Sequence, residues 1–173
     1  MSDTLVTVVA IGLAAILMFV FPLMTMSDRT DDVSQLTVDT ATTEFVDEIR
    51  TTGKITQDKY SQFLETIGST GNTYDVEMEL QVLDENPGKK TTQTTRDKIG
   101  ENVYYSVYTS QIKDKLEKDG VYKVKEGDIV SVNVKNTNQT LSQQLKNFFY
   151  KVVGNNTYTI AASQGGIVTA TGK

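Results

Sequence analysis

The chain of 173 residues contains no cysteine, no histidine and no tryptophan, and only two prolines. Without cysteine it can form neither a disulfide framework nor a thiolate metal site. Without histidine and cysteine it also lacks the usual general base, the reactive thiol and the common transition-metal ligands. A carboxylate-only site is the remaining route to catalysis, so we expect a non-enzymatic protein that needs no cofactor and no metal.

Charge is also sparse at one end of the chain. The net charge is -5 at pH 7, and Asp3 is the only charged residue among residues 1–27. The remainder of the chain is therefore mildly acidic, and a surface of that sign repels polyanions. We expect no nucleic acid partner.

Charged residues are absent from the segment TLVTVVAIGLAAILMFVFPLMTMS, residues 4–27. A helix over this segment would be about 36 Å long, enough to cross a hydrocarbon core of about 30 Å. A secretory signal would show a basic start, a shorter apolar core and a small-x-small cleavage site, whereas residues 1–5 carry an acid and no base. We expect residues 1–27 to be a retained membrane anchor and residues 28–173 to form one soluble domain.

Few charged residues are available to predict the orientation of this anchor in the membrane. No basic residue precedes the segment, and only Arg29 follows it closely. The positive-inside rule thus leans toward a cytoplasmic domain. The Thr-, Asn- and Gln-rich body without His or Cys is instead typical of a surface-exposed protein. On that composition we expect the soluble domain to lie outside the cytoplasm, at the cell surface.

Helical periodicity continues beyond the uncharged segment. Val38, Ala41, Phe45 and Ile49 recur at three- and four-residue spacing, which predicts an apolar stripe over a helix continuation at residues 28–52. We expect this stripe to dock on a sheet, and Gly53 to end the helix. If Pro22 kinks the helix without ending it, residues 4–51 form one helix of about 70 Å.

The later part of the chain mixes short helices with strands. Strict alternation from Tyr74 to Val82 predicts a half-buried strand, and a turn-rich loop follows around Pro87 and Gly88. Helices are predicted in residues 56–68, 110–120 and 140–154, strands in residues 102–110 and 127–136, and two short strands around a hairpin turn at Gly165 and Gly166. Without regular βαβ alternation, the predicted class is α+β with a mainly antiparallel sheet.

Three surface groups invite a chemical interpretation. Asp75, Glu77 and Glu79 share one face of a predicted strand and could collect calcium or act as an acid/base pair, but a solvated strand face is the preferred interpretation. A second set combines aromatic and basic residues, as a stacking platform for a polymer would: Tyr104, Tyr105, Tyr108, Lys113 and Lys115. Packing within a strand is the preferred interpretation of this set. Two Asn-x-Thr triplets, at Asn138 and Asn155, are attributed to chance in so Thr-rich a chain.

Small residues gather within the uncharged segment, at Ala10, Gly12, Ala14 and Ala15. Ala10 and Ala14 have the small-x-x-x-small spacing that lets helix backbones approach closely in lipid. This favours self-association, although Ala and Gly are also common in lone membrane anchors.

The run VVAIGLAAILMFVFP, residues 8–22, resembles the N-terminal helix of type IV pilins and pseudopilins. The resemblance is carried by Val8, Val9, Ala10, Ile11, Gly12, Leu13, Ala14, Ala15, Ile16 and Pro22. It implies a long helix that lies half in the membrane and half on an antiparallel sheet, with the apolar halves bundled into a filament core. It also implies motor-driven assembly, with copies of the chain or related pilin-like subunits and membrane lipid as partners.

Asp3 lies near the depth at which that family carries a glutamate, five residues into the processed chain. The family's processing site, a basic leader and a small residue before a hydrophobic residue, is not seen in the sequence, so whether the N-terminus is processed stays open. An acid in the membrane is expensive unless it pairs, for example with a neighbouring subunit's N-terminal amine. A plain interfacial charge is the other interpretation of Asp3.

Together these features predict a non-enzymatic structural subunit that assembles into a surface filament or pseudofilament through its N-terminal helix. Two alternatives stay open. The first is a bitopic accessory protein of a secretion or conjugation apparatus that does not polymerise. The second is an anchored extracytoplasmic domain that binds a ligand or glycan.

Overall fold

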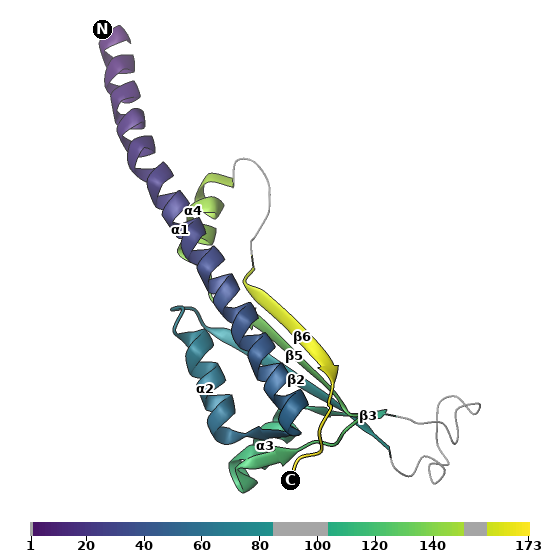
Figure 1. The fold of residues 1–173 in the computed structure, drawn as a ribbon. Coiled ribbons are helices and arrows are strands. Elements are labelled where there is room, and N and C mark those ends of the chain that lie inside the picture. Colours follow the sequence, from purple (N-terminus) through teal and green to yellow (C-terminus); the bar gives the residue numbers. More distant parts are fainter. Residues whose placement is uncertain (1, 85–103, 151–158) are drawn as a thin grey trace, which may run out of the picture.

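The computed structural model describes residues 2–84, 104–150 and 159–173. Its longest element is α1, one helix over Ser2–Thr52, about 75 Å long at 1.5 Å per residue. Figure 1 shows the N-terminal half of α1 projecting beyond the rest of the protein and its C-terminal half lying along the sheet. Because α1 runs on through Pro22, the prediction of one continuous helix over residues 4–51 is confirmed.

The C-terminal end of α1 is set by Gly53. Its N–H donates to the carbonyl of Ile49 at 2.9 Å, and its φ of 67° is a left-handed conformation that glycine adopts without steric cost. The C-terminal tail of the chain passes this point, where the N–H of Thr169 donates to the carbonyl of Arg50 at 2.8 Å. The end of α1 is therefore held between its own cap and the tail.

Below α1 lies a four-stranded antiparallel sheet with the order β3-β2-β5-β6. Its strands are β2 (Tyr74–Leu83), β3 (Tyr104–Tyr108), β5 (Ile129–Asn136) and β6 (Ala161–Ile167). In the central pair, buried Met78 lies opposite buried Val132, and exposed Glu77 lies opposite exposed Asn133. The sheet thus has one apolar and one polar face. The predicted α+β class, with a long helix packed on an antiparallel sheet and short helices, is confirmed.

Shorter elements surround this framework. Helix α2 (Gln57–Gly68) begins at Thr56, whose hydroxyl accepts from the N–H of Lys59 at 3.4 Å, and α3 (Thr109–Asp119) ends at Gly120 in the left-handed conformation. Both helices, and α4 (Leu141–Tyr150), lie where the sequence predicts them. The sequence does not predict the two-stranded sheet of β1 (Lys54–Thr56) and β4 (Val121–Lys123), because strands of three residues show no periodicity.

The hairpin predicted at Gly165 and Gly166 is wrong. Both glycines lie inside the single strand β6, opposite Ser131 and Val130 of β5. Their small size serves packing: a Cβ on Gly165 would lie 2.9 Å from the carbonyl oxygen of Val130, and one on Gly166 would lie 2.7 Å from Nε of Arg50. The loop predicted around Pro87 and Gly88, the triplet at Asn155 and the start of the strand at residues 102–103 lie outside the described residues.

The hydrophobic core fills the space between α1, α2 and the apolar face of the sheet (Figure 1). Each buried aliphatic or aromatic side chain contributes roughly 1.5–3 kcal/mol relative to exposure. The central residues are Val38, Phe45 and Ile49 from α1, Phe63 and Ile67 from α2, Met78 and Leu80 from β2, and Val130, Val132 and Val134 from β5.

Candidate functional site

The N-terminal half of α1 is an apolar surface that the other described residues leave almost entirely uncovered. Among the described residues, α1 is the helix that is long and apolar enough to cross a membrane, and its apolar window is not buried inside the protein. The predicted assembly residues are all exposed: Asp3, Val8, Val9, Ala10, Gly12, Ala14, Ala15 and Pro22. Such a helix is compatible with membrane anchoring.

Two threonine hydroxyls within this half bond to the helix itself. The hydroxyl of Thr7 donates to the carbonyl of Asp3 at 2.8 Å, and that of Thr25 donates to the carbonyl of Phe21 at 3.0 Å. A helix in hydrocarbon must pair its polar groups internally because no water is present to replace the missing bonds. Thr7 and Thr25 are therefore no obstacle to insertion.

Nothing among the described residues explains why Gly12 is small. A Cβ on Gly12 would meet no atom within 4 Å, although glycine in a helix interior is less favourable than alanine by about 1 kcal/mol. Elsewhere in the protein, Gly53, Gly165 and Gly166 stand where a Cβ would press on a neighbour. If the size of Gly12 has a packing reason, that reason lies in a contact with another molecule.

The C-terminal half of α1 carries the stripe that was expected to dock on the sheet. Val38, Ala41, Phe45 and Ile49 are all buried, with exposed fractions of 7% or less. The periodicity did not identify Thr42, which is also fully buried. Its hydroxyl donates to the carbonyl of Val38 at 2.6 Å. A hydroxyl satisfied by its own helix can be packed against apolar neighbours, and this makes the docking face wider than its apolar stripe.

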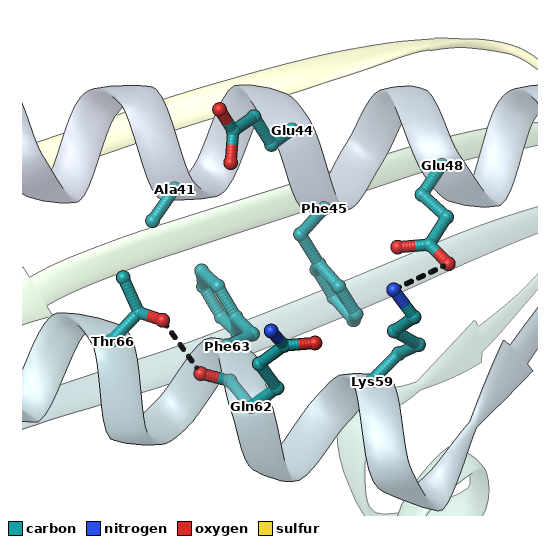
Figure 2. Close-up of a pocket in the computed structure, with 8 residues that line it drawn as sticks. All are labelled: Ala41, Glu44, Phe45, Glu48, Lys59, Gln62, Phe63 and Thr66. Atoms are coloured by element: carbon teal, nitrogen blue, oxygen red, sulfur yellow. Dashed lines mark hydrogen bonds and ion pairs between the residues drawn. The ribbon is translucent and has the colours of Figure 1, made fainter.

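Figure 2 shows a shallow groove between α1 and α2. The rings of Phe45 and Phe63 face each other within it, and Nζ of Lys59 lies 3.3 Å from Oε1 of Glu48 at its rim. Its volume of about 150 Å³ is below the roughly 300–1,000 Å³ of small-molecule sites. The groove is therefore the seam that joins two helices.

A polar contact joins α4 to α1 just beyond the uncharged segment. The ammonium of Lys146 lies 2.6 Å from Oδ1 of Asp28, and the hydroxyl of Ser142 also donates to that oxygen. The hydroxyl of Thr140 donates to Oδ2 of Asp31 at 2.7 Å. We call these five residues the α1–α4 clamp. The hydrogen bonds from Lys146 and Ser142 lower the pKa of Asp28 below its ordinary value, with burial opposing them.

Asp31 and Asp32 are adjacent in the sequence, but the structure separates them: Asp31 is 5% exposed and Asp32 faces solvent. The sequence Thr140-Leu141-Ser142-Gln143 carries a local signal for the start of α4, which places Thr140 beside Asp31. The backbone N–H of Gln143 donates to the Thr140 hydroxyl, and the side chain of Gln143 accepts from the N–H of Thr140, both at 3.2 Å. This is a capping box, which fixes the start of α4.

Polar side chains of α1 also reach the outer edge of β6. The Gln35 amide donates to the carbonyl of Ala161 at 2.7 Å and accepts from its N–H at 3.0 Å. Nε of Arg50 donates to the carbonyl of Ile167 at 3.0 Å. Both ends of an edge strand are thus bonded to the helix, which limits pairing with foreign strands.

The acidic set on β2 lies on the polar face of the sheet. Asp75 lies opposite Lys135 and Glu77 opposite Asn133, while Glu79 accepts from the hydroxyl of Ser106 at 2.7 Å. Among the described residues, no group of three or more Asp, Glu, His or Cys side chains is placed to hold a metal ion. The arrangement fits the preferred interpretation of a solvated strand face.

The lysines and tyrosines of the suggested stacking platform make separate contacts in the structure. Nζ of Lys113 lies 5.7 Å from the ring centroid of Tyr60, and Nζ of Lys115 lies 5.3 Å from that of Tyr122. The hydroxyl of Tyr104 donates to the carbonyl of Gly127 at 3.2 Å. Tyr105 and Tyr108 remain about half exposed on β3. These lysines and tyrosines form no single surface on which successive rings could stack.

The side chain of Asn138 is engaged within the protein. Its amide donates to Oδ1 of Asn72 and accepts from the N–H of Thr73, both at 2.9 Å, while Thr140, the last residue of the triplet, is buried in the α1–α4 clamp. In the folded protein this triplet does not present a free acceptor amide.

Comparison of the chain with protein-family models, with curated proteins and with solved structures found no match.

Proposed function

We propose that this protein is a pilin-like structural subunit, anchored in a membrane, that assembles into a surface filament or pseudofilament through the N-terminal half of α1. The observation that supports this most directly is the exposure of that half. Residues 3–19 are exposed along their whole length, while the other half of the same helix supplies the core of the folded domain. A bare apolar helix must be covered by lipid or by other apolar helices.

The small residues favour cover of this half of α1 by other helices as well as by lipid. Ala10, Gly12 and Ala14 are exposed, and no described residue packs against the place where a Cβ on Gly12 would lie. The small-x-x-x-small spacing of Ala10 and Ala14 lets a second backbone approach closely. The partners would be copies of this chain or related subunits. In this proposal α1 is the spine, and the sheet domain faces outward from it.

The proposal is tested by electron microscopy of full-length protein, both extracted in mild detergent and sheared from cells. Helically ordered filaments are expected. In a variant with Ala10→Leu and Ala14→Leu, the close approach is blocked, so filaments should be lost while the protein still inserts into membranes. The matched control carries Ile11→Leu and Ile16→Leu, which change bulky exposed residues of the same segment and should leave filaments intact.

Discrete membrane complexes or dispersed monomers from the unaltered protein would overturn assembly and favour a bitopic accessory protein. Filaments that survive in the variant with Ala10→Leu and Ala14→Leu would show that the helix face with Ala10 and Ala14 is not the contact between subunits.

The proposed location of the sheet domain outside the cytoplasm has its own test. Because the chain has no cysteine, Tyr108→Cys places a single thiol on β3, at a position 58% exposed. A membrane-impermeant maleimide added to intact cells should label this variant. Labelling only after the cells are broken would place the domain in the cytoplasm, as the single Arg29 would suggest.

A further inference from the structure

Helix α4 runs antiparallel to α1, toward the uncharged segment. Thr140, which directly precedes α4, donates to Asp31, and Lys146 within α4 pairs with Asp28, which comes earlier in α1. Helix α4 continues to Tyr150, about 6 Å beyond Lys146 at 1.5 Å per residue. The last turn of α4 therefore points along α1 toward the span (Figure 1).

The exposure of α1 shows how far its cover reaches. Among residues 3–26, Val20 and Met24 are the ones that are half-buried, and Ser27 and Asp31 are fully buried. These four residues follow one another at spacings of four, three and four, so they form one stripe along the helix. The element that packs on α1 beside Asp28 and Asp31 is α4. The covered stripe thus enters the uncharged segment by two turns.

The composition of α4 suits a lipid boundary. Lys146 is its single charged residue and is already tied to Asp28, while Leu141 stays 53% exposed although α4 is packed on α1. Its last turn reads Asn147-Phe148-Phe149-Tyr150. Aromatic residues beside a polar helix start are typical of segments at the level of the lipid headgroups.

We infer that the last turn of α4 lies in the interfacial layer of the membrane, so that the protein contacts lipid with two elements, the spanning half of α1 and the end of α4. This inference rests on the proposed anchoring of α1. The α1–α4 clamp would then sit at headgroup level, where its charges remain hydrated. It would fix how deeply α1 is inserted and hold the sheet domain against the membrane surface before assembly.

The absence of tryptophan allows a direct test. Single tryptophans are introduced into the full-length protein as Phe149→Trp, Phe19→Trp and Tyr108→Trp, and each variant is placed in phosphatidylcholine vesicles brominated at shallow or deep acyl positions. Phe19 is 77% exposed within the span, and Tyr108 lies on the sheet domain. Tyr150→Trp is a second probe of the last turn of α4, in case Phe149→Trp perturbs folding.

Shallow bromines are expected to quench the Phe149→Trp emission more than deep ones, deep bromines to quench Phe19→Trp more than shallow ones, and Tyr108→Trp to be unaffected. If Phe19→Trp is quenched while both α4 probes are not, the inference about α4 is overturned and the anchor stands. If Phe19→Trp is not quenched either, the proposed anchoring has failed. A blue-shifted but unquenched α4 probe would mean that protein covers this turn, which also overturns the inference.

Discussion

The rings of Phe45 and Phe63 stack with centroids 4.6 Å apart and planes inclined by 5° (Figure 2). Phe45 belongs to the C-terminal half of α1, and Phe63 belongs to α2. Both are about 95% buried. The pair is therefore a buried apolar contact between α2 and α1.

Removal of one ring should be costly. Phe63→Ala leaves a cavity beside Phe45, so the free energy of unfolding should fall by about 3–5 kcal/mol. Urea unfolding followed by circular dichroism in detergent measures this change. Leu64→Ala on the same helix, where the side chain is 38% exposed, should lower it by less than about 1 kcal/mol. Equal losses in the two variants would mean that the stacked pair does not anchor α2.

The α1–α4 clamp should make stability depend on acid pH. Because Lys146 and Ser142 lower the pKa of Asp28 in the folded state below the ordinary value of 3.8, the clamp's contribution is fully present above that ordinary value. It is lost as the pH falls through the lowered pKa of the folded state. The effect should be no more than about 1 kcal/mol, because the Asp28 side chain is 43% exposed and solvent screens the pair.

Unfolding measured between about pH 5 and pH 2 checks this prediction by comparison with Asp28→Asn, which should lose the corresponding part of the pH dependence. Asp32→Asn, at an exposed neighbouring position, is the control and should behave like the unaltered protein. If Asp28→Asn and the unaltered protein share one pH profile, the charge of Asp28 makes no contribution to stability.

Gly53 should be far less tolerant of substitution than Gly120, although both have similar positive φ values of 67° and 71°. A Cβ on Gly53 would overlap the backbone of Ala170 and Gly172, whereas one on Gly120 would meet no atom within 4 Å. Gly120→Ala should lower the free energy of unfolding by about 1 kcal/mol from backbone strain alone. Gly53→Ala should cost more and release the C-terminal tail, which faster amide exchange at Thr169 would reveal.

Gln35 should protect the edge of the sheet. Gln35→Ala removes the two hydrogen bonds to Ala161, and the free energy of unfolding should fall by about 1–2 kcal/mol. Amide exchange at Ala161 should become faster, while Thr40→Ala, at an exposed position of the same helix, should leave it unchanged. Unaltered exchange at Ala161 in Gln35→Ala would show that the edge needs no such protection.

Sequence patterns predicted the elements whose cause is local. The 3.6-residue period of Val38, Ala41, Phe45 and Ile49 and the alternation along β2 both follow from which side of an element faces apolar neighbours. The end of α1 at Gly53 follows from the bonding needs of helix ends. The hairpin at Gly165 and Gly166 was predicted from the same local logic and was wrong, because those glycines are small to make room for Val130 and Arg50.

The amino-acid sequence by itself determined that an uncharged helix of membrane-spanning length is followed by an amphipathic one and by strands of an antiparallel sheet, because charge, length and periodicity are local properties. Only the tertiary structure decided what the polar residues of α1 do. Asp31 bonds to a residue 109 positions away, and Gln35 to one 126 positions away. Such partners are set by the packing of the whole chain, because a buried carboxylate such as that of Asp31 must find a donor wherever the fold supplies one.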